Sequence, residues 1–174
     1  MAESNQQVWR SLIVDVPDFP EPGILFRDVT PLLENGAGLR SAVDALAAAF
    51  TNVDVVAGIE SRGFIFGAPV AYALGVGMVP VRKPGKLPRA TASADYALEY
   101  GTNTLQLHRD AVTPGQRVLV VDDVLATGGT AAATVTLIEE LGAQVTGVAV
   151  LIELTALGGR AKLGDVPLVS LLSY

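Results

Sequence analysis

The sequence predicts an α/β fold, with a mainly parallel sheet of about five strands and helices on both faces. Three observations support this prediction: short apolar runs of strand length, helix-like segments between them, and an apolar content of 50%. The apolar runs are residues 53–59, 78–81, 118–121 and 145–151. Such runs are typical of parallel strands buried on both faces, and helix-like segments between them are typical of crossover connections.

Two amphipathic segments, residues 38–50 and 130–141, are the predicted crossover helices. Apolar side chains recur at spacings of three and four in both segments, as at Leu39, Val43 and Leu46 in the first. This spacing places the apolar side chains on one helical face. We therefore expect each helix to pack against the sheet.

The composition bounds the size of the fold and the class of partner. With 174 residues and a mean hydropathy of +0.43, the chain fits a single domain, residues 1–174. Twelve basic and 18 acidic residues give a net charge of −6, which argues against a general binder of nucleic acid or anionic membranes. The sequence has no cysteine, which excludes disulfide scaffolds, zinc ribbons and thiol nucleophiles.

Residues 63–81 carry no charge and are almost long enough to cross a bilayer. Glycines and prolines interrupt this stretch, so we expect a short helix at about residues 69–74 and a strand at residues 78–82 instead. The first twelve residues lack the apolar core and the cleavage site of an export signal. We expect a soluble, cytoplasmic protein.

Two further segments do not fit the pattern of strands and helices. Four prolines and a glycine between Pro17 and Pro31 exclude a regular helix there, and we expect residues 1–34 to form an appended hood. Residues 83–100 are rich in proline, glycine, serine, threonine and alanine, which leaves little to anchor them in a core. We expect this second segment to be a mobile loop.

The segment VLVVDDVLATGGTAAA, residues 118–133, carries the predicted chemistry. Gly128 and Gly129 permit positive φ, so that consecutive backbone N–H groups can surround an anion. Thr127 and Thr130 add hydroxyl groups, and the helix that follows adds its positive end. The turn has neither the lysine and spacing of a Walker loop nor the GxGxxG of a dinucleotide fold. We expect the turn, which begins at Ala126, to bind a single phosphate monoester.

Asp122 and Asp123 come directly before this turn, at the carboxyl end of the predicted strand. Two acids beside a phosphate would repel it unless they face hydroxyl groups or a metal-bound group. A ribose 5-phosphate fits this arrangement. The structural alternative is a solvated acidic pair followed by a glycine-rich turn.

At this point the chain resembles the type I phosphoribosyltransferases, whose phosphoribosyl pyrophosphate signature has the form of DDVLATGGT after VLVV. Other motifs are similar to those of the adenine phosphoribosyltransferases within that family: DFPEPGILFRDVTPLL (18–33), ESRGFIFG (60–67), VRKPGKLP (81–88) and YALEYG (96–101). The resemblance covers nearly the whole chain. It implies transfer of the 5-phosphoribosyl group from 5-phospho-α-D-ribose 1-diphosphate (PRPP) to N9 of adenine, yielding AMP and pyrophosphate. It also implies Mg²⁺ as cofactor and a homodimer.

Basic residues in two places are candidates for binding pyrophosphate. Arg62 follows the strand at residues 53–59, from which its guanidinium can reach phosphate oxygens, although it can also pair with Glu60. Four of the twelve basic residues fall within eight positions, namely Arg82, Lys83, Lys86 and Arg89. Such a cluster can be a solvated loop or an anion site. The resemblance implies that both groups meet pyrophosphate, and that Arg82 can reach the site of a neighbouring subunit.

Leu25, Phe26 and Arg27 lie in the proline-rich hood. The aromatic ring can fill the core or form a stacking wall for a flat base. The resemblance implies that Phe26 stacks on adenine and that backbone groups of Leu25 and Arg27 bond its edge. A backbone carbonyl that accepts from the amino group of adenine opposes the oxygen of hypoxanthine, which predicts selectivity of roughly 10⁴-fold or more.

Roles remain to be assigned to Glu99, Tyr100, the acidic pair and His108. The resemblance implies that Glu99 is the acid/base and that Tyr100 lies near the reaction centre, whereas composition alone suggests a solvated pair. Asp122 and Asp123 are not expected to bind Mg²⁺ directly but through water, since pyrophosphate and ribose supply most of its oxygen ligands. We expect His108 to be structural, on a helix formed by LQLHRD.

Two other functions stay open from the sequence. One is transfer to hypoxanthine, guanine or xanthine, for which the hood would present different edge groups. The other is a regulator that senses PRPP without turnover. Such regulators usually carry an added nucleic-acid-binding element, for which this chain has neither spare length nor a broad basic face.

Overall fold

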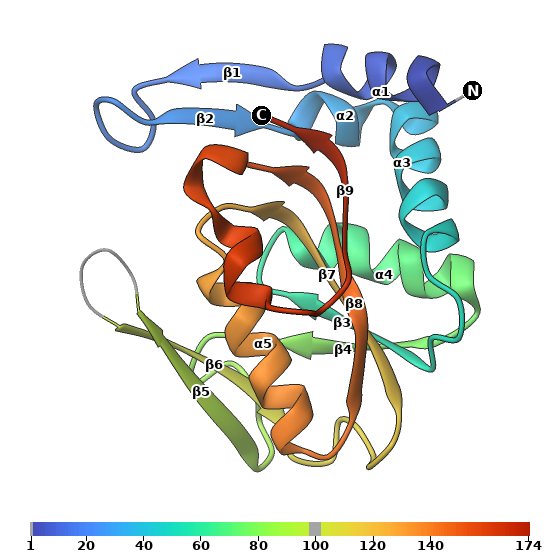
Figure 1. Ribbon diagram of the computed structural model, residues 1–174, viewed down its shortest axis with the longest axis vertical. Coiled ribbons are helices and arrows are strands. Elements are labelled where there is room, and N and C mark those ends of the chain that lie inside the picture. The colour runs from blue at the N-terminus through green and yellow to red at the C-terminus, as the bar shows by residue number, and fades with distance from the viewer. Residues whose placement is uncertain (1, 98–101) are drawn as a thin grey trace.

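The computed structural model describes residues 2–97 and 102–174, and it contains the predicted parallel sheet. Five strands, all parallel, lie in the order β4-β3-β7-β8-β9 (Figure 1). Their bounds are Val55–Ile59 for β3, Gly77–Val81 for β4, Arg117–Leu125 for β7, Gln144–Glu153 for β8 and Leu168–Ser173 for β9. The four apolar runs correspond to β3, β4, β7 and β8. Ser170 interrupts β9 and Ser173 ends it, so this strand has no comparable run.

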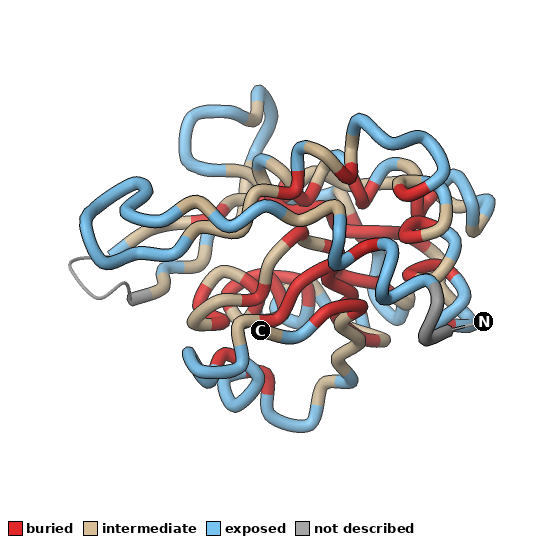
Figure 2. Tube along the Cα trace, turned by 90° about the horizontal axis from the view of Figure 1, so that it is seen from above, coloured by how far each residue is buried: buried red, intermediate tan, exposed pale blue. Residues whose placement is uncertain are grey.

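The side chains of the central strand β7 alternate between two apolar cores, one on each face of the sheet. Leu119 and Val121 pack into the core that α3 and α4 cover, and Val118 and Val120 pack into the core that α5 covers. All four side chains are fully buried, and buried residues run through the centre of the molecule in Figure 2. The sheet is therefore covered on both faces.

Helices α3 (Gly36–Ala48) and α5 (Gly129–Glu140) match the predicted crossover helices to within two residues at each end. Helix α4 (Gly63–Leu74) begins six residues before the predicted start. The sequence does not reveal this start, because the helix is apolar around most of its circumference and shows no helical period. None of the helices in the described part of the chain is long and apolar enough to cross a membrane.

Residues 2–34 contain more regular structure than the sequence predicts. They form helix α1 (Ala2–Ser11), the antiparallel strands β1 (Val14–Pro17) and β2 (Leu25–Asp28), and the short helix α2 (Thr30–Glu34). Trp9 anchors α1, since its side chain is buried and its indole N–H donates to the Ser41 hydroxyl at 2.8 Å. The prolines lie at the end of β1, in the β1–β2 connection and in the first turn of α2.

The prediction of an irregular loop over residues 83–100 is wrong for residues 91–97. These residues form β5 (Thr91–Ala97), which pairs with β6 (Thr102–His108) in an antiparallel hairpin outside the main sheet (Figure 1). Ala92, Ala94 and Tyr96 alternate with polar residues and pack toward the core, a strand period that composition alone conceals. Mobility of the segment stays a prediction.

His108 lies at the end of strand β6 and not on the predicted helix. Its side chain is buried, and its Nδ1 lies 3.2 Å from the guanidinium of Arg89. Arg89 also pairs with Asp110. His108 thus packs at the base of the hairpin, in keeping with a structural residue.

Candidate active site

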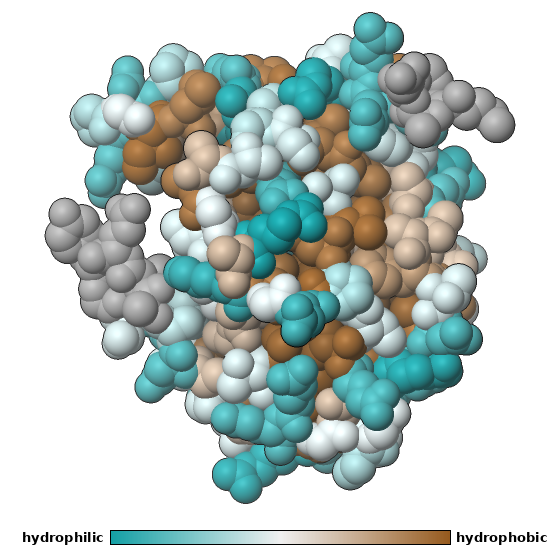
Figure 3. All heavy atoms as spheres, in the orientation of Figure 1, coloured by the Kyte–Doolittle hydropathy of each residue, from teal (hydrophilic) through white to brown (hydrophobic). Residues whose placement is uncertain are grey.

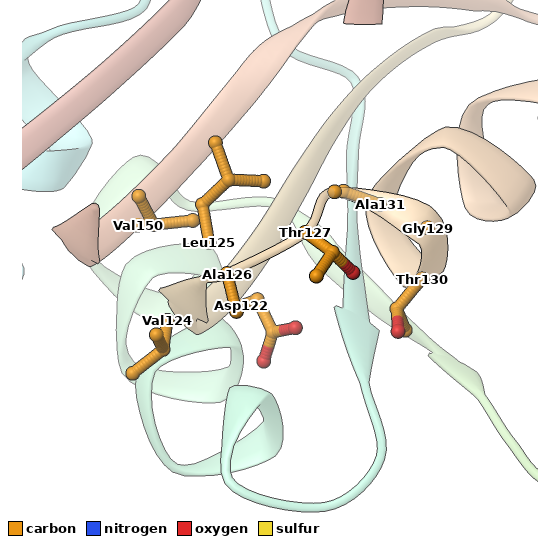
Figure 4. Close-up of a pocket in the computed structure, with 10 residues that line it drawn as sticks. Asp122, Val124, Leu125, Ala126, Thr127, Gly129, Thr130, Ala131 and Val150 are labelled. Carbon is orange, nitrogen blue, oxygen red and sulfur yellow. The ribbon is translucent and has the colours of Figure 1, made fainter. Parts of the chain in front are cut away.

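Residues 126–130 form a tight turn between β7 and α5, as the glycine-rich motif predicts. Gly128 has φ +77° and is the N-cap of α5, and Gly129 is the first residue of the helix. The turn lines a cavity of about 70 Å³ together with Asp122 and Val150, and Figure 4 shows these side chains around it. Backbone N–H groups at a helix N-terminus favour an anion. The geometry suits a small phosphate group.

A second backbone segment, which the sequence analysis misses, supports this turn. A Cβ atom on Gly128 would overlap the carbonyl oxygen of Gly159, and one on Gly159 would lie 2.8 Å from the Gly128 nitrogen. Glu153 holds the Gly159 segment through Arg160, with Nε–Oε1 and Nη2–Oε2 distances of 2.9 and 2.6 Å. The hydrogen bonds from Arg160 lower the pKa of Glu153, and one from Ser170 adds to this effect. The contact between Gly128 and Gly159 leaves no room for a Cβ atom on either residue, so both positions require glycine.

Asp122 and Asp123 lie within β7, beyond the point where its pairing with β3 ends at Val121. The strand continues to Leu125, so the acids do not end it as the sequence predicts, and their side chains point to different sides. Burial raises the pKa of Asp122 well above its ordinary value, and the adjacent charge of Asp123 raises it further. The Asp122 carboxylate accepts from the Asp123 N–H at 2.9 Å.

Arg62 pairs with Asp123 and not with Glu60, the alternative that the sequence leaves open. Its Nε lies 2.7 Å from Asp123 Oδ2, which is buried and has no directed hydrogen bond in the described part of the chain. Glu60 instead accepts from the Lys83 N–H at 2.9 Å and pairs with Arg82 at 3.2 Å. Burial acts to raise the pKa of Glu60, but these contacts outweigh it and lower the pKa.

The predicted cationic residues do not all meet at one cavity. A polar cavity of about 290 Å³ brings Arg62 and Lys83 together with Asp122, Asp123 and Thr130. Lys86 and Arg89 do not line this cavity. The guanidinium of Arg82 lies over the ring of Phe64 at 5.8 Å, and Arg89 pairs with Asp110.

An apolar cavity of about 270 Å³ lies between the hood and Asp123. Leu25, Phe26 and Arg27 line it, as does Leu154, which the sequence analysis misses. Phe26 is half-buried and packs edge-on against Phe19, with ring centres 5.1 Å apart, so it lines a cavity and does not fill the core. Apolar atoms gather at this end of the molecule in Figure 3, over the β1–β2 hairpin.

The acidic pair is compatible with a magnesium ion that is held mainly by its substrate. Among the described residues, no group of three acidic or histidine side chains surrounds one point. Asp122 and Asp123 both line the polar cavity, and carboxylate oxygens suit Mg²⁺, which keeps several waters in most protein sites.

The two predicted residues Glu99 and Tyr100 lie outside the described residues. The strand positions on either side, Tyr96 and Asn103, line the polar cavity. The β5–β6 hairpin therefore borders the cavity that holds Arg62 and Lys83.

Comparison with known proteins identifies the family. The model of the phosphoribosyl transferase domain matches residues 31–166. The adenine phosphoribosyltransferase of a Nocardioides species is 63% identical over 169 residues, covering 94% of this chain and 91% of that protein. The structure of the Rhodothermus marinus adenine phosphoribosyltransferase aligns with a TM-score of 0.95 and 50% identity, over 99% of both chains. The Saccharomyces cerevisiae enzyme, complexed with adenine and an imino-altritol bisphosphate, aligns with a TM-score of 0.93 and 41% identity over 98% of this chain and 99% of that one. The chain therefore belongs to the phosphoribosyltransferase family and, within it, to the adenine phosphoribosyltransferases.

Proposed function

We propose that the enzyme transfers the 5-phosphoribosyl group of PRPP to N9 of adenine, giving AMP and pyrophosphate for purine salvage. Membership of the adenine phosphoribosyltransferases supports this reaction. The observation that carries it is the meeting of three cavities at Asp122 and Asp123: an amide-lined, a polar and an apolar cavity. The 5-phosphate, the pyrophosphate and the base have the corresponding chemistry.

The 5-phosphate binds in the turn of Ala126, Thr127, Gly128, Gly129 and Thr130. Backbone N–H donors and the positive end of α5 stabilise a phosphate there without a lysine. Asp122 and Asp123 bind the ribose hydroxyl groups. The raised pKa of Asp122 reduces the negative charge beside the phosphate, and Arg62 offsets the charge of Asp123.

Pyrophosphate occupies the polar cavity, where Arg62 and Lys83 contact its oxygens. Lys86, which does not line this cavity in the structure, adds to the anion site when pyrophosphate binds, and Arg82 reaches the site of a second subunit. Mg²⁺, held by substrate oxygens and through water by Asp122 and Asp123, neutralises charge on the pyrophosphate. These residues therefore stabilise the leaving group.

Adenine occupies the apolar cavity, with Phe26 stacked on the base and backbone groups of Leu25 and Arg27 bonded to its edge. The Arg27 side chain is engaged by Asp15 and lies over Tyr174, so we assign recognition of the base to its main chain. Selectivity against hypoxanthine then resides in the main chain. A mismatched base would leave buried polar groups unpaired, which costs roughly 10⁴-fold in specificity.

The bond from the anomeric carbon to pyrophosphate breaks ahead of the bond to N9, with inversion at that carbon. Positive charge develops on the sugar and negative charge on the pyrophosphate, so the binding groups act mainly in the transition state. Glu99 assists proton transfer from the imidazole side of adenine as N9 becomes the nucleophile, and Tyr100 lies nearby. Closure of residues 83–100 excludes water from the activated sugar.

The enzyme acts as a homodimer in the cytoplasm. Helix α4 is evidence for the dimer, because Ile65 and Tyr72 on this apolar helix are 42% and 89% exposed. PRPP and AMP are multiply charged and do not diffuse across membranes, which supports a cytoplasmic site of action.

The test is direct detection of AMP from adenine and PRPP, with and without Mg²⁺. We expect AMP only with Mg²⁺ present, and adenine to be used almost exclusively from an equimolar mixture with hypoxanthine, guanine and xanthine. Preferential use of another base would assign a different purine substrate. Tight binding of PRPP without AMP formation would indicate a sensor.

A further inference from the structure

Tyr174 packs against two arginines and lines none of the three cavities of the site. The guanidinium carbons of Arg27 and Arg10 lie 4.2 and 4.5 Å from the centre of its ring. Arg27 belongs to β2 and also pairs with Asp15 on β1. Its side chain is only 17% exposed, and a cation over an aromatic ring is most favourable when it is shielded from water. Tyr174 thus contacts the hood through its ring.

The backbone of Tyr174 bonds to the residues on both sides of Leu154. Its N–H donates to the Glu153 carbonyl at 3.0 Å, and its carbonyl accepts from the Thr155 N–H at 2.8 Å. The Thr155 hydroxyl donates to the same carbonyl at 2.7 Å. Leu154, between these residues, lines the apolar cavity with Leu25. Tyr174 is therefore fixed to the Leu154 wall of the cavity by its backbone, and to the hood wall by its ring.

We infer that Tyr174 is a positioning residue for the base: through Arg27, its ring sets the distance between strand β2 and Leu154. This inference rests on the proposed function, in which the cavity between these walls holds adenine. Loss of the ring would release the hood wall and leave the backbone bonds at Leu154 in place. The phosphate turn is linked to Tyr174 through backbone hydrogen bonds, from Tyr174 to Glu153 and from Leu154 to Leu125. Loss of the ring leaves these bonds in place, so binding of PRPP should be little affected.

The test compares Tyr174→Leu with Tyr174→Phe, which keeps the ring and removes only the hydroxyl. We expect Tyr174→Leu to raise the KM for adenine by about 5- to 30-fold, the equivalent of one shielded cation–π contact, with the KM for PRPP changed less than about twofold. Tyr174→Phe should restore the wild-type KM for adenine. Unfolding temperatures of both variants show whether the comparison is between folded proteins.

Arg27→Met gives the same test from the hood side if Tyr174→Leu does not fold, with Asp15→Asn as the control for the ion pair. An unchanged KM for adenine, an equal rise in both KM values, or equal damage in the Leu and Phe variants would overturn the inference. A wild-type enzyme that makes no AMP contradicts the proposed function instead. The adenine dissociation constants of the wild type, Tyr174→Leu and Tyr174→Phe, measured by calorimetry, then decide the role of Tyr174.

Discussion

Replacement of Gly128 by alanine is expected to damage the phosphate turn for two reasons. The left-handed conformation of Gly128, at φ +77°, costs an alanine about 1–2 kcal/mol. The new Cβ would also overlap the carbonyl oxygen of Gly159 and lie 2.9 Å from its Cα, and this obstacle is backbone that cannot rotate away. Overpacking of this kind costs about 1–3 kcal/mol. The sum of about 2–5 kcal/mol corresponds to a rise of at least about 30-fold in the KM for PRPP, if the turn moves to relieve the overlap.

Gly115→Ala is the matched control for this prediction. Gly115 also has positive φ, at +80°, but no atom lies within 4 Å of an added Cβ. It lies in the turn before β7, at the opposite end of the strand from the phosphate turn. The KM for PRPP and the unfolding temperature should be measured for both variants. Similar values for Gly128→Ala and Gly115→Ala would refute the idea that contact with Gly159 shapes the turn.

Other substitutions test the acidic residues. Asp123→Ala and Glu99→Ala are each expected to leave the circular dichroism spectrum unchanged and to lower kcat by about 100-fold or more, since each removes a group from the reaction centre; wild-type turnover in a folded variant would exclude that residue from catalysis. Asp122→Asn should raise the unfolding temperature at pH 7. Burial raises the pKa of Asp122 above its ordinary value of 3.8, so the wild type loses stability as the pH rises and this carboxyl ionises. The gain in unfolding temperature should vanish below about pH 4, where Asp122 is protonated and so is as neutral as the asparagine that replaces it. An equal gain at pH 7 and below pH 4 would contradict burial of an ionised Asp122 as the cause.

The main sheet and its crossover helices are predictable because their signals are local. The runs that become β3 and β7 are continuously apolar, and α3 has a clear helical period. Helix α4 is extended beyond its prediction because a helix that is apolar all round has no period to detect. Strand β5 is missed because its alternating alanines resemble the bland composition of the loop before it.

The phosphate turn is predictable for the same reason, since its residues are consecutive in the sequence. Gly159, Leu154 and Tyr174 give no such signal, because their contacts with the site join segments far apart in the chain. The basic cluster at residues 82–89 poses the opposite problem, because closeness in the sequence does not give these residues a shared contact. Arg82 and Arg89 fall close together in the sequence, but tertiary partners direct them to different places, Glu60 in one case and Asp110 in the other.

The structure of the enzyme with AMP bound tests the assignment of the site most directly. We predict that the phosphate oxygens of AMP lie about 2.7–3.2 Å from backbone N–H groups of residues 127–130, with the base between Phe26 and Leu154. A phosphate bound against Lys83 and Lys86, with no ligand at the glycine turn, would contradict the central role given to that turn.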